Sequence, residues 1–109
     1  MAQIIKVLGQ STPSAASLTT LYTVPALSSS VISSIVICNI SATPTSFRVA
    51  IRPAGASISN EHYIYYDVAI AGNDTFIATV GLTLATTDVI SVYATLATLS
   101  FNLFGTENT

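Results

Sequence analysis

Hydrophobic and polar residues alternate along most of this chain with a period of two. Residues 47–52 (FRVAIR) place three apolar side chains on one side and both arginines on the other, and residues 75–84 alternate similarly between apolar side chains and threonines. Successive side chains of a β-strand point to opposite faces, so this pattern predicts strands with one buried face. No stretch of helical length has apolar residues at helical spacing, so we expect an all-β chain.

Turn-forming residues separate these runs at short intervals. The prolines belong at strand ends or in loops, because proline cannot donate a ladder hydrogen bond. Eight strands are predicted: Ile4–Leu8, Thr19–Val24, Val31–Asn39, Ser46–Arg52, His62–Ile70, Asp74–Leu84, Val89–Thr95 and Ser100–Phe104. The ends, Met1–Gln3 and Glu107–Thr109, are expected to be short tails. Seven or eight short strands favour a single-domain antiparallel β-sandwich over residues 1–109, jelly-roll-like or immunoglobulin-like, with the strand order left open.

The composition adds a constraint on surface chemistry. Only 7% of the 109 residues are charged, whereas 14 serines and 15 threonines supply most of the polarity. A lone monomer with so few charges has little protection against association, so we expect an assembly that covers much of the surface. Three basic residues against five acidic ones exclude extensive phosphate neutralisation, so no nucleic-acid partner is predicted.

Neither a membrane segment nor a disulfide is expected. The most apolar run, residues 31–40, is interrupted by two serines and an asparagine and is shorter than the about 18 residues of a membrane span. No secretory signal is predicted, because Lys6 interrupts the only early apolar stretch. The single Cys38 excludes an intrachain disulfide and a cysteine-based zinc site, so intracellular synthesis is expected.

Few residues have the chemistry that catalysis requires. His62 is the one side chain with an ordinary pKa near neutrality, and no hydrolase motif accompanies it, so it is interpreted as a strand-end surface residue. The oxygen donors match no calcium loop, and hydrogen bonding at turns is their expected role: Asp67, Asn73, Asp74 and Asp88. We therefore predict a protein that is not an enzyme and has neither cofactor nor metal.

Two groups are candidates for an interface. In a regular strand the cluster HYIYYD divides between two faces, Tyr63, Tyr65 and Asp67 on one and His62, Ile64 and Tyr66 on the other. Such tyrosines suit either core and sheet packing or a partner surface, and both interpretations stay open. Arg48 and Arg52 share a face roughly 13 Å apart. They suit either carboxylates of a partner subunit or ordinary ion pairs within the chain.

The order of segments resembles that of small β-sandwich virion proteins of tailed bacteriophages, including phages that infect cyanobacteria. The segments that carry this resemblance lie between residues 21 and 105: LYTVP (21–25), VISSIVICN (31–39), TSFRVA (45–50), HYIYYDV (62–68), NDTF (73–76), GLTL (81–84) and SFNLFG (100–105). They form a pattern of strands and turns and contain no catalytic signature.

The resemblance implies one of two structural roles. Standalone members are cement or decoration proteins, homotrimers on the outer capsid surface that clamp neighbouring major capsid subunits. Similar domains in tail fibres and tailspikes form trimeric tips that contact the host surface. The absence of heptads or fibre repeats favours the cement role, and the short tails leave clamping to the sandwich faces. The alternative is a tip that recognises host glycan through tyrosines such as Tyr63, Tyr65 and Tyr66.

Overall fold

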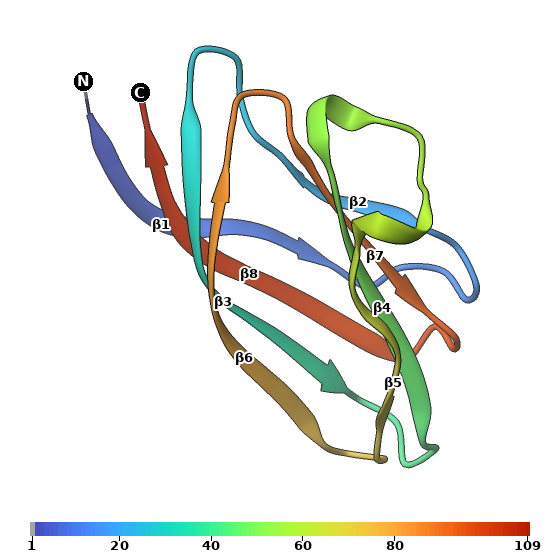
Figure 1. Cartoon of the computed structure of the whole chain (residues 1–109). Coiled ribbons are helices and arrows are strands. Elements are labelled where there is room, and N and C mark those ends of the chain that lie inside the picture. Colours follow the sequence, from blue (N-terminus) through green and yellow to red (C-terminus); the bar gives the residue numbers. More distant parts are fainter. Residues whose placement is uncertain (1) are drawn as a thin grey trace.

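The computed structural model describes residues 2–109, which form two four-stranded antiparallel sheets packed face to face (Figure 1). Sheet A contains, in spatial order, β1 (Gln3–Ser11), β8 (Leu99–Asn108), β3 (Ser29–Asn39) and β6 (Thr75–Leu84). Sheet B contains β2 (Thr19–Thr23), β7 (Val89–Ala94), β4 (Thr45–Arg52) and β5 (Tyr63–Ile70). The loop between β4 and β5 holds two short 3₁₀ turns, η1 (Pro53–Gly55) and η2 (Asn60–His62). The predicted antiparallel β-sandwich is confirmed.

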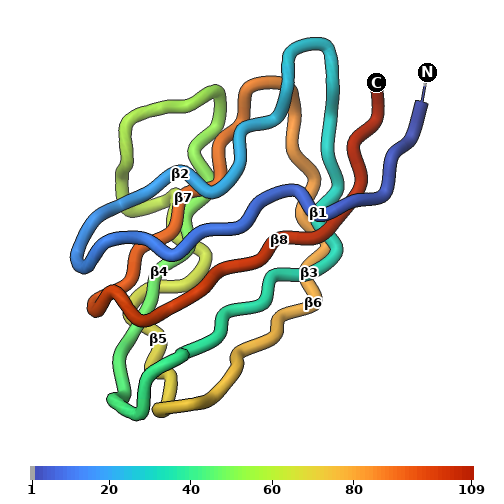
Figure 2. Tube along the Cα trace, turned by 180° about the vertical axis from the view of Figure 1, so that it is seen from behind, coloured from blue at the N-terminus to red at the C-terminus, as the bar shows by residue number. Residues whose placement is uncertain are grey.

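The strand order is that of one long hairpin rolled on itself. β1 pairs with β8, β2 with β7, β3 with β6 and β4 with β5, and the roll closes through the β3–β8 and β4–β7 pairings. This is the wrapping of an eight-stranded jelly roll. It leaves β1 and β2 at one open side of the sandwich and β5 and β6 at the other (Figure 2).

The core lies between the inner faces of the two sheets and is centred on Phe47, which is 0% exposed. The Phe47 ring centroid is 5.1 Å from that of Phe76 and 6.4 Å from that of Phe101. Tyr65 and Phe76, whose ring centroids are 5.4 Å apart, come from the edge strands β5 and β6. The contact between these two rings closes the side of the sandwich that lies between β5 and β6.

Sheet A bends where its strands change register together. An extra residue is inserted in β1 between Val7 and Gly9 and in β3 between Ile32 and Ser34, whereas β8 takes the shorter path through Gly105. A Cβ atom at Gly105 would overlap the carbonyl oxygen of Val31, so glycine is needed for this close approach. Bulges increase the local bend and twist of a sheet. Here they tilt the part of sheet A that holds the start of β1 and the end of β8.

The predicted tails belong to paired strands in the described residues. β1 begins at Gln3, β8 continues through Asn108, and Ala2 and Thr109 exchange backbone hydrogen bonds of 2.9 and 2.8 Å. Met1, which was also assigned to a tail, lies outside the described residues. The expectation was wrong for Gln3, which pairs with Asn108, and for Glu107–Asn108, because the alternation of buried and half-buried residues in β8 continues to Asn108. None of the helical turns in residues 2–109 is long and apolar enough to cross a membrane.

Candidate binding surfaces

Two bulges in β5 redirect the tyrosines of the HYIYYD segment. The aligned pairs between β4 and β5 are Ala50–Tyr63, Val49–Tyr65 and Phe47–Val68, so β5 has one extra residue in each interval. Residues three apart normally lie on opposite faces of a strand, but here the rings of Tyr63 and Tyr66 meet edge to face, with centroids 4.9 Å apart and planes at 85°. The predicted division of this segment between two faces was therefore wrong.

Tyr65 belongs to the core and takes no part in this outward pair. Its ring centroid is 6.2 Å from that of Phe47, in an edge-on contact. Of the two interpretations left open for the tyrosines, core packing holds for Tyr65, whereas Tyr63 and Tyr66 lie on the outer face of sheet B. Tyr66 is 56% exposed.

Arg48 links three strands across the outer face of sheet B. Its guanidinium carbon lies 4.2 Å from the ring centroid of Tyr66 in β5 and 4.3 Å from that of Tyr93 in β7. Its Nε donates to Asp67 Oδ1 at 2.6 Å, and this hydrogen bond raises the pKa of Arg48 above its ordinary value. Arg48 therefore has an ion pair within the chain. We call Tyr93, Arg48, Tyr66 and Tyr63 the stacked row.

An open hollow of about 470 Å³ lies beside the stacked row and is lined by Asn60, Tyr63 and Tyr66. Asn60 begins η2, which ends at His62. The backbone N–H of Ser59 donates to His62 Nδ1 at 3.2 Å, so His62 stabilises the turn that carries Asn60. The hollow thus combines two aromatic rings with one amide.

Arg52 is separate from the stacked row, although it shares the outer face of β4 with Arg48. It lies opposite Val89 of β7, and its Nε is buried without a hydrogen-bond partner among the described residues. Arg52 forms no ion pair within the described residues, and it does not line the hollow. The partner-carboxylate interpretation therefore stays a prediction for Arg52.

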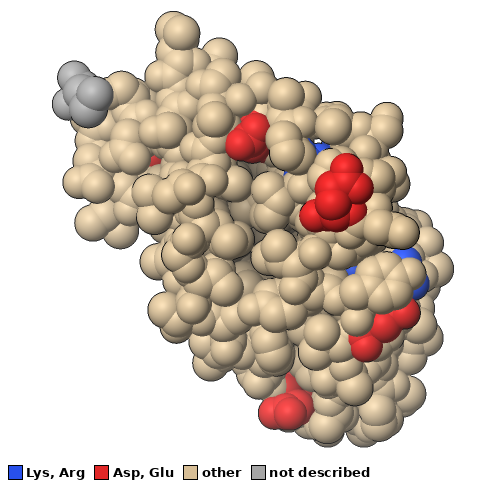
Figure 3. Space-filling view, viewed as in Figure 1, with Lys and Arg blue, Asp and Glu red and all other residues tan. Residues whose placement is uncertain are grey.

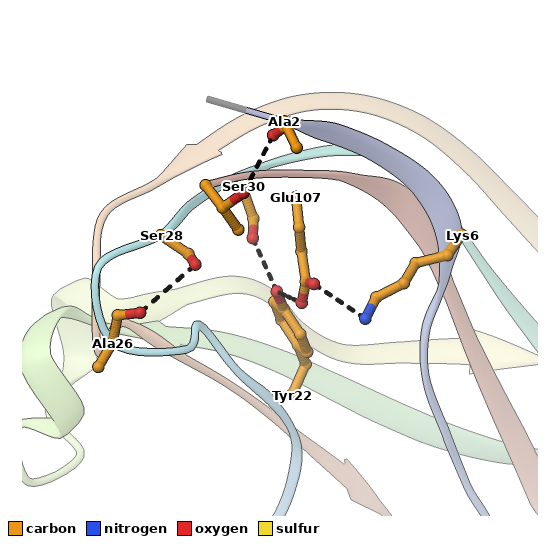
Figure 4. A network of polar contacts seen from close by, with 8 residues as sticks. Ala2, Lys6, Tyr22, Ala26, Ser28, Ser30 and Glu107 are labelled. Atoms are coloured by element: carbon orange, nitrogen blue, oxygen red, sulfur yellow. Dashed lines mark hydrogen bonds and ion pairs between the residues drawn. The ribbon is translucent and has the colours of Figure 1, made fainter.

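A polar network is buried between the upper part of sheet A and β2 (Figure 4). Glu107, which is 6% exposed, accepts a hydrogen bond from the Tyr22 hydroxyl at 2.6 Å and forms an ion pair with Lys6 Nζ at 2.8 Å. The Tyr22 hydroxyl also lies 2.7 Å from Ser30 Oγ. The hydrogen bond from Lys6, then that from Tyr22, lowers the pKa of Glu107, whereas burial raises the pKa of Tyr22 to about 12. Such a satisfied network has a structural role.

The outer face of sheet A is a broad surface without an Asp, Glu, Lys, Arg or His side chain in the described residues. The charged residues of these four strands are Lys6 and Glu107, which pair with each other on the inner face. Cross-strand rows on the outer face are Thr83–Val31–Thr106–Ile5, Thr79–Ser34–Phe104–Val7, Ile77–Val36–Asn102–Gln10 and Thr75–Cys38–Ser100. Ile5 is 84% and Ile77 66% exposed. We call this surface the neutral face.

The remaining charges lie elsewhere, mostly on sheet B and in turns. In Figure 3 the red and blue atoms occupy a few isolated places, whereas the left of the view, where sheet A lies, is almost entirely uncharged. Asp88 accepts hydrogen bonds from the backbone N–H groups of Ala54 (2.9 Å) and Ala85 (2.8 Å), as expected of a turn residue. Asp74 accepts one from Thr75 at 2.8 Å. No group of three potential metal ligands occurs in residues 2–109.

Sequence reasoning missed several residues of these surfaces. Tyr93 and Asn60 were not candidates, because their approach to Arg48 and Tyr66 depends on strand order and loop path. Asp67 was assigned to a turn, but it pairs with Arg48 from a bulge in which its φ is 50°. Positive φ is several-fold enriched in Asp, and this was the one sequence signal of the bulge. No protein-family model matches this chain, and neither does any curated protein or solved structure compared with it.

Proposed function

We propose that this chain is a non-enzymatic structural protein of a tailed-bacteriophage virion, a homotrimeric cement or decoration protein on the outer surface of the capsid. The observation that carries the proposal is the neutral face, which exposes large apolar side chains such as Ile5 and Ile77 and has no charged side chain among the described residues. Such a surface loses little desolvation energy when another protein covers it. The viral context comes from the segment resemblance, and jelly rolls are a common architecture of viral capsid domains.

In this role the protein holds capsid subunits together from outside. A capsid under internal genome pressure fails when neighbouring subunits separate. A rigid sandwich bound across several subunits adds an interface that must open first, and a specific interface buries about 1,600 Å² in total. A trimer binds through three such interfaces at once, which raises its effective affinity.

The edge strand β6 supports self-association as well as docking. It is ten residues long, it contains neither proline nor a charged residue, and in sheet A it pairs only with β3. Natural proteins usually protect such an edge with lysine, proline or a covering element, because its free backbone groups pair with other chains. We infer that β6 and the adjoining neutral face are covered in the assembled protein.

A direct test is to count copies per virion by quantitative mass spectrometry against the major capsid protein. A cement protein is present in hundreds of copies, and particles that lack it leak or soften under heating. About a dozen copies or fewer per particle would contradict the cement role and would favour the alternative, a trimeric receptor-binding tip.

A second test uses the purified chain. Light scattering is expected to give three times the chain mass of 11.3 kDa. Ile77→Lys places a charge on β6 and the neutral face and is expected to shift the protein to monomer. Ile64→Lys, on β5, the edge strand of sheet B at the same open side of the sandwich, is the matched control and is expected to leave the trimer intact. A wild-type monomer throughout the micromolar range would exclude the trimer.

The receptor-binding alternative is favoured by a different observation, the tyrosine-lined hollow on sheet B. Jelly rolls are also a common architecture of lectin domains, so the fold is compatible with both roles. Host lipopolysaccharide binding together with low copy number would support this alternative over the cement role.

A further inference from the structure

We propose that the hollow formed by Asn60, Tyr63 and Tyr66 binds a neutral pyranose unit of a surface polysaccharide. This inference deepens the receptor-binding alternative by naming the ligand of the same hollow, and it does not depend on the cement role, because the hollow lies on sheet B and the neutral face lies on sheet A. A single molecule therefore presents both surfaces at once, one to its assembly and one to its surroundings.

The shape of the hollow suits a ring-shaped ligand with both polar and apolar sides. Its volume of about 470 Å³ falls within the range of about 300–1,000 Å³ typical of ligand sites. The Tyr63 and Tyr66 rings stand at 85° and form a corner, and both rings line the hollow. The polarised C–H groups of a pyranose are attracted to the electron-rich face of an aromatic ring. The Asn60 amide both donates and accepts hydrogen bonds, which matches pairs of sugar hydroxyls.

The stacked row holds this corner in place before a ligand arrives. Arg48 lies 4.2 Å from the Tyr66 ring centroid, and it is fixed in turn by Asp67 and by Tyr93. Ordering a free side chain on binding costs conformational entropy, so a ring that is already stacked binds with less entropic loss. Arg48 is thus a positioning residue that acts through Tyr66.

The charges near the hollow favour a neutral ligand over an acidic one. The Arg48 guanidinium is neutralised by Asp67, at 2.6 Å, and is sandwiched between two rings. Glu61, next to Asn60, is exposed, and the whole chain has a net charge of −2. An anionic sugar would therefore meet no free cation among the residues that line the hollow.

The test is affinity electrophoresis of the purified protein through gels that contain mannan, dextran or galactan as neutral polymers, or polygalacturonate as an acidic one, supported by a glycan array. We expect retardation by at least one neutral polymer. Tyr66→Ala and Asn60→Ala are each expected to weaken binding at least tenfold, which corresponds to about 1.4 kcal/mol. Ile64→Ala, on the same strand but outside the hollow, is the matched control and is expected to bind as the wild type does.

Further variants separate positioning from general stability. Arg48→Lys keeps the charge but loses the planar stacking group, so we expect it to bind more weakly while its melting temperature is unchanged. Tyr66→Phe keeps the ring and is expected to keep most of the affinity. Asn60 lies in the loop and outside the core, so its variant remains informative if Tyr66→Ala does not fold. Binding to the acidic polymer alone, no binding to any neutral glycan on the array, or wild-type affinity in Asn60→Ala would overturn the proposal. None of these results bears on virion copy number, which tests the cement role separately.

Discussion

At the level of single residues, the burial of the Glu107 carboxylate is compensated by an ion pair and a hydrogen bond. Lys6 and Tyr22 both approach it within 2.8 Å, and Ser30 contacts the same tyrosine hydroxyl. The Lys6 side chain is 44% exposed, so water still contacts part of this ion pair. Removing one member leaves the others partly buried without a partner, which is costly for polar groups.

Glu107→Gln is predicted to reduce the free energy of unfolding at pH 7 by about 1–3 kcal/mol. Because the folded state lowers the pKa of Glu107, the carboxylate stabilises the fold above its unfolded pKa, and this contribution is lost as the pH falls through the folded value. The deficit of the variant should therefore be full at pH 7 and should shrink below about pH 4. Urea unfolding at several pH values measures it.

Asp74→Asn is the control for this experiment, because Asp74 lies in an exposed turn and asparagine keeps the oxygen that accepts from Thr75. We expect its stability to follow the wild type at every pH. If the stability lost in Glu107→Gln stayed the same from pH 7 down to pH 2, the charge of Glu107 would not be what stabilises the fold.

The tyrosine segment shows how far sequence reasoning reached at this scale. An interface role was proposed for Tyr63, Tyr65 and Tyr66 together, whereas the structure directs Tyr65 into the core and the other two outward. The difference arises from one extra residue on each side of Tyr65, because an inserted residue reverses the facing of every later residue in the strand. Alternation alone contains no sign of such bulges.

At the level of secondary structure, the positions of all eight strands were predictable from β-forming runs bounded by turn signals, although β1 has no buried residue and both β1 and β8 extend past their predicted ends. The pairing order was not predictable, because strands with similar apolar faces fit several sandwich topologies. Pairings such as Gln3 with Asn108 connect opposite ends of the sequence, and local pattern says nothing of them. The stacked row depends on this order, since it crosses β7, β4 and β5.

The bend in sheet A gives a prediction for two glycines. Gly105→Ala is expected to cost about 1–3 kcal/mol of stability, because the new methyl group overlaps the Val31 carbonyl oxygen and forces β3 and β8 apart. Gly81→Ala, in the edge strand β6, meets no atom within 4 Å and is expected to be neutral or stabilising by up to about 1 kcal/mol. Thermal unfolding of the two variants measures the difference. Equal effects would mean that close packing at the bend is not what requires glycine.

At the level of the whole molecule, charge is confined to one part of the surface. Two of the three cations form ion pairs within the chain, Lys6 with Glu107 and Arg48 with Asp67, and the neutral face has no charged side chain in the described residues. The self-association proposed for this face would therefore be driven by apolar burial, which salt does not screen.

We predict that the trimer is insensitive to ionic strength. Between about 0.05 and 0.5 M NaCl its dissociation constant should change less than about twofold, because screening acts only on charges. Ammonium sulfate should strengthen association, since excluded salts favour burial of apolar surface. Analytical ultracentrifugation at several salt concentrations provides the measurement. A trimer that dissociates as NaCl increases would indicate contacts through the charged sheet B.

The place of β8 between β1 and β3 also constrains how the protein is made. During synthesis β1 emerges first, yet its neighbour in the sheet is translated about a hundred residues later, from Leu99 onward. Until β8 has been made, the nascent polypeptide exposes apolar strands that cannot yet form sheet A. Chains growing on adjacent ribosomes expose the same strands. Folding of sheet A is thus delayed until β8 has been translated, and exchange of β1 between neighbouring nascent copies competes with it.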